Sequence, residues 1–250
     1  MLSALLSLKS KLLKTPLDEF HSAPYLRHNQ RRLEHLASLR LPLSGQRVLE
    51  VGAGVGDHTS FFLDRGCTVL CTEGRKENLA LLRSRFRDDP RVTVQLLDLE
   101  VSGLSEARPA PLGPVDIVYC YGVLYHLSDP AAALSYLARC TRRLLLLETS
   151  VSYGDGDAVN QVREDAALVS QAVSGQGCRP TRGFVLSRLR AAFPHVYTPL
   201  TQPCHEEFPL DWGAAPQAGL ARAVFIASRA PLADNPLLTE ELPQQQRRQD

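Results

Sequence analysis

The chain has 250 residues, of which 44% are hydrophobic and 22% charged, and these values exclude a mainly disordered or fibrous protein. Twenty-eight basic residues against 27 acidic residues leave a net charge of +1, so no overall field draws the chain to nucleic acid or to an anionic membrane. The length predicts one large domain with extensions.

Residues 1–45 are expected to form an N-terminal helical extension on the substrate side of the protein. Residues 1–47 hold eight basic and three acidic residues, a local charge of +5 (8 − 3). Such a segment can contact nucleic acid, but the solvated face of amphipathic helices is the more common reason for it. The basic residues are Lys9, Lys11, Lys14, Arg27, Arg31, Arg32, Arg40 and Arg47.

The sequence carries no clear signal for membrane insertion, for secretion or for disulfide formation. No run of 18 or more apolar residues exists, and the first residues lack the basic start and the cleavage site of a secretory signal. The six cysteines include no C-x-x-C pair, so neither a zinc knuckle nor a disulfide framework is expected. We expect a cytoplasmic protein with no membrane partner, and its oligomeric state stays open.

Residues 46–230 alternate between short apolar runs rich in strand formers and segments with helical periodicity. This alternation predicts a parallel sheet with helices on both faces, the doubly wound α/β class. The expected strands are 47–51, 68–72, 92–97, 115–120, 144–148, 196–200 and 223–227. The expected helices are 58–64, 76–86, 131–139 and 184–192.

Three segments interrupt this pattern. Residues 107–114 are rich in proline and predict a loop, and residues 150–180 form a polar, glycine-containing insertion that is too long for an ordinary connection. We interpret that insertion as functional. The tail 231–250 contains three prolines and three consecutive glutamines, and we expect it to be loosely attached.

The strongest local signal is an apolar strand that runs into the turn Gly52-Ala53-Gly54-Val55-Gly56 and opens a helix. Glycine permits positive φ and close approach of the backbone to a ligand, and a helix N-terminus offers free N–H groups. The spacing is G-x-G-x-G, whereas a dinucleotide site needs G-x-G-x-x-G. Asp57 stands where the third glycine would be, and its charge would repel a pyrophosphate. The turn therefore predicts a cofactor other than a dinucleotide.

Acidic residues end the next two expected strands. Glu73 lies 17 residues after Gly56, the position from which a carboxylate accepts two ribose hydroxyls. Asp98 is well placed to meet an adenine amino group. Replacing Glu73 by alanine is expected to weaken cofactor affinity and to leave the melting temperature of the ligand-free protein nearly unchanged.

Glu50, the glycine turn, Glu73 and Asp98 together resemble the motif series of the class I S-adenosylmethionine-dependent methyltransferases, over about residues 45–150. The resemblance implies a mostly parallel, seven-stranded Rossmann-like sheet and S-adenosylmethionine as cofactor. By this resemblance the turn would contact the methionine part of the cofactor, Glu50 its ammonium group, Glu73 the ribose, and Asp98 the adenine. The full implied cofactor set is Glu50, Gly52, Ala53, Gly54, Gly56, Glu73, Gly74, Asp98, Leu99 and Tyr121.

The run G-V-L-Y-H-x-x-D-P at residues 122–130 resembles the family's fourth motif, beside the methyl group and the acceptor. It looks like the motif of small-molecule methyltransferases and of tRNA wobble-uridine carboxymethyltransferases, and it does not separate the two groups. The Asn-Pro-Pro-Tyr type signature of many nucleic-acid amino methylases is absent from this position.

Methyl transfer from a sulfonium is an in-line displacement, so alignment matters more than covalent machinery. A hydroxyl or ammonium acceptor must also lose a proton, and His126 is the titratable group best placed to take it, with Tyr125 beside the methyl site. The competing interpretation is that His126 bonds the backbone or caps the Asp129-Pro130 turn. Both remain open at this point.

Acceptor recognition should come from segments outside the common core. Arg27 and His28 in the N-terminal extension and Arg179 in the insertion are the candidate substrate-binding residues. His205 stands next to two glutamates, a pattern that is more often surface charge than metal ligation, so no metal site is expected.

The leading hypothesis is an S-adenosylmethionine-dependent methyltransferase that acts on an oxygen or nitrogen of a small-molecule or glycan-type acceptor. The first alternative is an enzyme that modifies RNA such as tRNA, and nucleic acid is therefore the less favoured partner. The second alternative is a non-catalytic scaffold that binds the cofactor.

Overall fold

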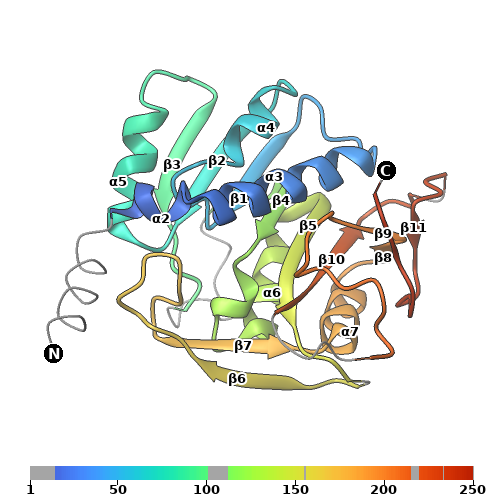
Figure 1. Ribbon diagram of the computed structural model, residues 1–250. Helices are drawn as coiled ribbons and strands as arrows, with labels where there is room; N and C mark the ends of the chain where they lie inside the picture. The colour runs from blue at the N-terminus through green and yellow to red at the C-terminus, as the bar shows by residue number, and fades with distance from the viewer. Residues whose placement is uncertain (1–14, 101–111, 155, 215–219, 233, 250) are drawn as a thin grey trace, which may run out of the picture.

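The computed structural model of the chain describes residues 15–100, 112–154, 156–214, 220–232 and 234–249 (Figure 1). Two sequence predictions fall partly beyond these ranges. The basic residues Lys9, Lys11 and Lys14, and residues 107–111 of the expected loop 107–114, lie outside the described residues.

The main sheet has eight strands in the order β11-β8-β10-β5-β4-β1-β2-β3. Strands β1 to β5 are parallel to one another, whereas β10 runs antiparallel between β5 and β8. The doubly wound, mostly parallel sheet is therefore confirmed, with one strand more than the seven expected. The strands are β1 (Arg47–Val51), β2 (Thr68–Glu73), β3 (Val92–Leu96), β4 (Val115–Tyr121), β5 (Thr141–Val151), β8 (His195–Pro199), β10 (Ala221–Ser228) and β11 (Leu238–Thr239).

Helices cover both faces of this sheet (Figure 1). The apolar runs of the strands explain why, because alternate side chains of one strand point to opposite faces and both faces must be buried. In β1, Val48 packs in one apolar core with α3 and α4, and Leu49 packs in the other with α6 and α7. The helices are α2 (Pro16–Phe20), α3 (Ala23–Ser38), α4 (Thr59–Leu63), α5 (Lys76–Arg85), the 3-10 turn η1 (Leu124–His126), α6 (Pro130–Cys140) and α7 (Arg182–Ala192).

The insertion after β5 contains a second, two-stranded sheet. Strands β6 (Val159–Arg163) and β7 (Gln176–Pro180) pair antiparallel, and Figure 1 shows them as a ribbon apart from the main sheet. We call residues 156–181 the β6–β7 arm. The sequence did not reveal these strands because β6 is polar and mostly exposed, so hydrophobic alternation is missing.

The expectation of a loosely attached tail is wrong. Residues of β11 pair with the edge strand β8, and β12 (Arg247–Arg248) pairs with β9 (Thr201–Gln202). The indole Nε1 of Trp212 also donates to Oε1 of Gln246 at 2.6 Å. Backbone pairing at a sheet edge holds the tail, and polar, proline-containing sequence gives little sign of such pairing.

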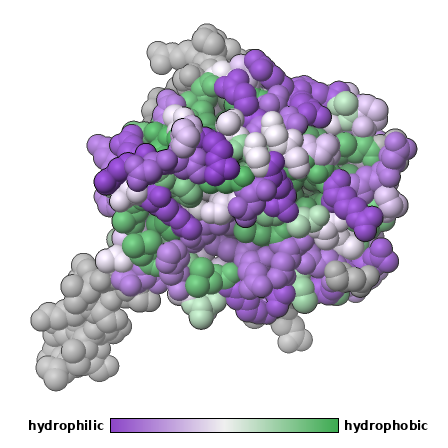
Figure 2. Space-filling view, turned by 90° about the horizontal axis from the view of Figure 1, so that it is seen from above, coloured by the Kyte–Doolittle hydropathy of each residue, from purple (hydrophilic) through white to green (hydrophobic). Residues whose placement is uncertain are grey.

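Polar and apolar residues are interspersed on the face shown in Figure 2. Among the described residues, no helix is both long and apolar enough to cross a bilayer.

The chain order of the sheet creates a crevice. From β1 the chain proceeds to β2 and β3 on one side, and it then returns to β4 on the other side of β1. Ligands of doubly wound folds bind at such a reversal, outside the carboxyl ends of the strands. The glycine turn after β1 and the residues that follow β2, β3 and β4 meet at this edge.

Candidate functional site

The glycine turn after β1 is tightly enclosed. Gly52 has φ +66° and Gly54 has φ +58°, the left-handed region in which other residues are strained. A Cβ on Gly52 would lie 2.3 Å from the side chain of Val123, and one on Gly54 would lie 3.3 Å from the ring of Phe20. The amide of Ala53 donates to the carbonyl of Thr72 at 2.9 Å. The turn is thus fixed between the β4–α6 connection and α2.

Gly56 differs from the other glycines of the turn. It lines neither of the two cavities described below, and a Cβ there would lie 2.7 Å from Leu82 and 2.5 Å from Phe86. Its positive φ of 86° and this close contact with α5 give Gly56 a packing role. The expected contact between Gly56 and the cofactor has no counterpart in these cavities.

A cavity of about 120 Å³ lies at the ends of β2 and β3, and we call it the adenosyl cavity. Its wall includes the residues that the sequence assigned to ribose and adenine, together with aromatic residues of α2 and α3 and part of the β6–β7 arm. These residues include Glu73, Gly74, Asp98, Leu99, Phe20, Tyr25, Ser170 and Gln171.

Glu73 is held by the backbone before any ligand arrives. Its Oε2 accepts from the amide of Gly54 and its Oε1 from the amide of Arg75, both at 2.9 Å. Only 7% of the residue is exposed, and this burial raises the pKa of Glu73 above its ordinary value. The carboxylate therefore links the end of β2 to the glycine turn.

Asp98 and Leu99 form the far wall of the adenosyl cavity. Oδ1 of Asp98 accepts from the amide of Glu100 at 2.9 Å, which fixes the carboxylate after β3. Leu99 is 6% exposed and packs in the core that includes α6. One fixed carboxylate and one apolar side chain suit the edge and the face of a purine.

Glu50 is buried beneath the glycine turn. Its Oε2 accepts from the hydroxyl of Thr59 at 2.7 Å, and 2% of the residue is exposed. Burial raises the pKa of Glu50 to about 7. Glu50 and Ala53 line a second, larger cavity, so an ammonium group bound there would meet a carboxyl group that ionises readily near neutral pH.

The larger cavity measures about 380 Å³, and we call it the acceptor cavity. It shares wall residues with the adenosyl cavity, so the two form one continuous site. The shared residues are Phe20, Tyr25, Val51, Gly52, Gly54, Gly122, Ser170 and Gln171. The acceptor cavity brings together five residues that the sequence singled out: Arg27, His28, Tyr121, Tyr125 and Arg179.

Two buried arginines line this cavity and share one buried glutamate, and the sequence did not predict a role for any of the three. Arg32 of α3 pairs with Oε2 of Glu148 on β5, and Arg222 of β10 donates to Oε1 of Glu148 at 3.0 Å. Burial alone would raise the pKa of Glu148, but the two guanidinium groups hold it below its ordinary value. A charged residue at the end of the apolar run 144–148 was the available signal; its partners are 116 and 74 positions away.

Tyr125 has two guanidinium groups close to its ring. Its ring centre is 4.8 Å from Cζ of Arg222 and 5.0 Å from Cζ of Arg179, and its hydroxyl accepts from Arg222 at 3.1 Å. The hydroxyl of Tyr121 is buried and has no hydrogen-bond partner among the described residues. Its ring stacks on Tyr119 with centres 4.4 Å apart. Both tyrosines therefore have fixed rings at the cavity wall.

His126 lines the adenosyl cavity and not the acceptor cavity. Its Nδ1 pairs with the carboxylate of Glu164 in the β6–β7 arm. Burial lowers the pKa of His126, and the neighbouring Glu164 opposes that change. Glu164 also accepts from the amide of Ala172 at 2.8 Å. These contacts tie η1 to the arm, and the assignment of His126 as the proton acceptor stays a prediction.

A protein-family model described as "Methyltransferase domain" matches residues 49–143. Among curated proteins, the chain is 32% identical over 130 residues to ribosomal RNA small subunit methyltransferase A of Anaeromyxobacter dehalogenans, covering 48% of this chain and 44% of the relative. It is 26% identical over 176 residues to the ubiquinone biosynthesis O-methyltransferase of Paracidovorax citrulli, covering 64% and 71%.

A further relative is the tRNA U34 carboxymethyltransferase of Alcanivorax borkumensis, 35% identical over 145 residues, with 56% of this chain and 42% of the relative covered. The chain thus spans less than half of the length of the RNA-modifying relatives it matches. The family match, residues 49–143, contains the glycine turn and the carboxyl ends of β2, β3 and β4.

Two solved structures share the fold. The N-terminal domain of EvdMO1, described in the presence of SAH and D-fucose, superposes with a TM-score of 0.59 at 24% identity, over 81% of this chain and 82% of that one. An S-adenosylmethionine-dependent methyltransferase from Mesorhizobium loti superposes with a TM-score of 0.55 at 18% identity, over 80% and 98%. At these identities the likeness concerns the fold alone.

Proposed function

The chain contains a class I S-adenosylmethionine-dependent methyltransferase domain, and from this premise we propose that it transfers the methyl group to an oxygen or nitrogen of a small-molecule or glycan-type acceptor. S-adenosylmethionine is the cofactor of this family, and it is also the cofactor that the sequence predicted.

The observation that carries the proposal is the acceptor cavity. A volume of about 380 Å³, continuous with the adenosyl cavity at Gly52, Gly54 and Gly122, is within the range of small-molecule sites. Helices α2 and α3 and the β6–β7 arm all contribute to its wall. Such a wall favours an acceptor that is largely enclosed over one that is presented on a long polymer.

When bound, S-adenosylmethionine would supply an electrophilic methyl group for transfer from its sulfur to the acceptor atom. The protein has to hold both molecules in line and exclude water. We assign Glu73 and Asp98 to the adenosine, Glu50 to the ammonium group, and Tyr121 and Tyr125 to the methyl site. Arg27, His28 and Arg179 are assigned to the acceptor.

A hydroxyl or ammonium acceptor must also release its proton. We propose that the proton leaves to water in the acceptor cavity, and His126 is the alternative proton acceptor. Because His126 borders the adenosyl cavity, an acceptor atom in reach of it has to sit close to the methyl group.

Methyl transfer from S-adenosylmethionine with an isotopically labelled methyl group tests the proposal. Mass spectrometry would follow the label into separate panels of hydroxylated small molecules, deoxy-sugars, amines and RNA. We expect labelled product from a small molecule, and its loss in Glu73→Ala. Glu77→Ala is the matched control, because Glu77 is an exposed glutamate of the neighbouring helix α5. Label in RNA alone would contradict the proposal.

The identity to RNA-modifying relatives favours a second candidate, RNA modification. That function requires binding to a polyanion, and the observed affinity for RNA would then fall steeply as salt rises, because bound phosphates release counterions. Weak binding to RNA with little salt dependence would remove this candidate.

A further inference from the structure

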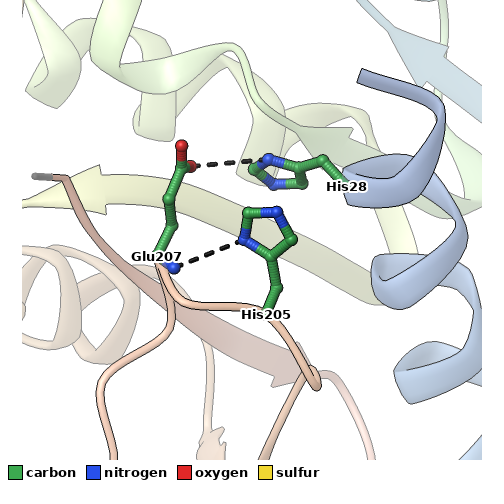
Figure 3. A group of neighbouring side chains, drawn as sticks. All are labelled: His28, His205 and Glu207. Carbon is green, nitrogen blue, oxygen red and sulfur yellow. Dashed lines mark hydrogen bonds and ion pairs between the residues drawn. The ribbon is translucent and has the colours of Figure 1, made fainter. Parts of the chain in front are cut away.

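We propose that His28, His205 and Glu207 bind a divalent transition-metal ion of the zinc class on the acceptor side of the cavity. Each of these residues offers one ligand atom, and the three atoms lie within 4.8 Å of one another. His28 comes from α3, whereas His205 and Glu207 come from the segment between β9 and β10 (Figure 3). All three line the acceptor cavity.

The three side chains are already directed toward one another. The ring centres of His28 and His205 are 4.5 Å apart, and Nδ1 of His28 lies 3.4 Å from Oε2 of Glu207. The amide of Glu207 donates to Nδ1 of His205 at 3.3 Å. Zinc binds nitrogen and oxygen at about 2.0–2.2 Å, so tetrahedral ligands lie about 3.3 Å apart and each side chain needs a shift of about 1.5 Å or less.

Burial supports ligand binding by the two rings. The side chains of His28 and His205 are 13% and 6% exposed, and Nε2 of His28 has no hydrogen-bond partner among the described residues. An ion bound through this Nε2 would recover the free energy that an unpaired buried polar atom costs, whereas an ion bound through Nδ1 would use the nitrogen that faces Glu207. Metals bind the neutral imidazole, and burial lowers the pKa of both histidines below their ordinary value.

Two imidazoles and one carboxylate form a donor set with a known preference. Three protein ligands of the His₂Glu type leave a position of a zinc ion open for water or substrate, and imidazole favours zinc or cobalt over magnesium. The ligands line the acceptor cavity, so the open position is available to an acceptor hydroxyl. That role toward an acceptor rests on the proposed function, whereas the metal site itself does not.

The neighbouring charges limit how tightly the ion binds. Arg222 donates to Oε2 of Glu207 at 2.5 Å, and Arg27 pairs with the adjacent Glu206 at 2.7 Å. The same Oε2 lies nearest Nδ1 of His28, so an ion bound there shares this oxygen with Arg222 or binds through Oε1 after the carboxylate turns. The three arginines Arg27, Arg32 and Arg222 balance Glu148, Glu206 and Glu207. A divalent ion adds two positive charges to this neutral group, which favours an acceptor oxygen that releases its proton to water and becomes anionic.

Metal binding by the full chain tests the site without any acceptor. We would dialyse the apoprotein against Zn²⁺ or Co²⁺ alone, measure bound metal by plasma mass spectrometry and titrate Co²⁺ by its visible absorption. We expect one equivalent of either ion and none of Mg²⁺ at the same concentration. His28→Gln and His205→Gln should each weaken Zn²⁺ and Co²⁺ binding at least tenfold. Removing a residue that only hydrogen-bonds a metal ligand already costs about tenfold or more in metal affinity, and removing a ligand should cost no less.

His195→Gln is the matched control, because His195 lies on β8 and lines neither cavity. Circular dichroism would show that each variant is folded. Absence of a metal equivalent in the wild type, or equal binding in all three variants, would overturn the site. If the ion binds as expected but turnover of a known acceptor is the same with and without it, the role toward the acceptor is overturned. Absence of turnover on any acceptor with the metal equivalent intact would instead count against the proposed function.

Discussion

The two halves of the cleft are built in different ways. The adenosyl half consists of consecutive strand ends of one sheet, and its key groups are glycines with positive φ and carboxylates held by backbone amides. The acceptor half joins α3, the β4–α6 connection, the β6–β7 arm and the segment before β10. Its charged groups are held mainly by one another, as Arg32, Glu148 and Arg222 show.

This difference explains how one domain can serve many acceptors. The adenosyl half depends on backbone geometry that few sequence changes can preserve, whereas the acceptor half depends on side chains from separate segments that can change independently. We therefore expect substitutions in the adenosyl half to act mainly on cofactor affinity, and substitutions in the acceptor half to act on stability and acceptor binding.

The largest effect is expected for Glu148→Gln. The substitution removes the carboxylate partner of buried Arg32 and one of the two carboxylate partners of buried Arg222, and breaking a buried pair in this way costs about 3–5 kcal/mol. Denaturant titration of the ligand-free protein measures it. Asp157→Asn is the control, because the Asp157–Arg188 pair is exposed and should contribute about 1 kcal/mol or less. A loss for Glu148→Gln no larger than for the control would show that the acceptor half does not depend on this network.

Glu50 should give the free energy of unfolding a pH dependence of its own. In the unfolded chain a glutamate ionises above its ordinary pKa of 4.5, whereas buried Glu50 stays protonated up to about pH 7. The unfolded state is thus favoured increasingly between pH 4.5 and 7, and stability falls by about 3 kcal/mol over that window and is level above it.

The stability difference between wild type and Glu50→Gln, measured by denaturant titration from pH 4 to pH 8, isolates this contribution. Saturating S-adenosylmethionine should reduce the fall, because an ammonium group beside Glu50 stabilises its ionised form. A difference that does not change with pH would contradict the buried, protonated state of Glu50.

Glu73→Ala should weaken the binding of S-adenosylhomocysteine at least about tenfold, since charge-assisted hydrogen bonds contribute roughly 1.5–3 kcal/mol each. The structure changes one part of the expectation from sequence. Because Glu73 also accepts from the amides of Gly54 and Arg75, we now expect the variant to lose stability as well, by about 1–3 kcal/mol.

Calorimetric titration and thermal unfolding of Glu73→Ala and the exposed control Glu77→Ala measure the two effects separately. Unchanged affinity in Glu73→Ala would remove this residue from the adenosyl half. If Glu73→Ala loses cofactor affinity but keeps its stability, the expectation drawn from the sequence alone is correct.

The smallest effect is expected for His126→Asn. Its contact with Glu164 ties η1 to the β6–β7 arm, so we expect KM for the cofactor to rise several-fold while kcat stays within a few-fold. A general base typically contributes about 10² to 10⁴ in rate. A hundredfold fall in kcat, with loss of the acidic limb of its pH profile, would show that His126 is the proton acceptor.

Strands β1 to β5, β8 and β10 and helices α4 to α7 followed from the sequence because a buried parallel sheet needs continuous apolar runs, and the runs at 47–51 and 115–120 are of this kind. The glycine turn, Glu73 and Asp98 followed too, because each lies at or just beyond the carboxyl end of a strand, and parallel strands bring these ends to one edge. The local sequence pattern was therefore sufficient to predict the part of the site that local backbone geometry forms.

Only the tertiary structure decided the rest. Polar β6 and the tail strands β11 and β12 form because partner strands offer backbone groups, and no side-chain period records that. The packing of Gly56 against α5 and the contact between His28 and His205, which are 177 positions apart in the sequence, also became visible only in the folded chain. Contacts between distant segments depend on how the whole chain packs, so the sequence by itself determined the cofactor half of this protein, and the folded chain determined the acceptor half.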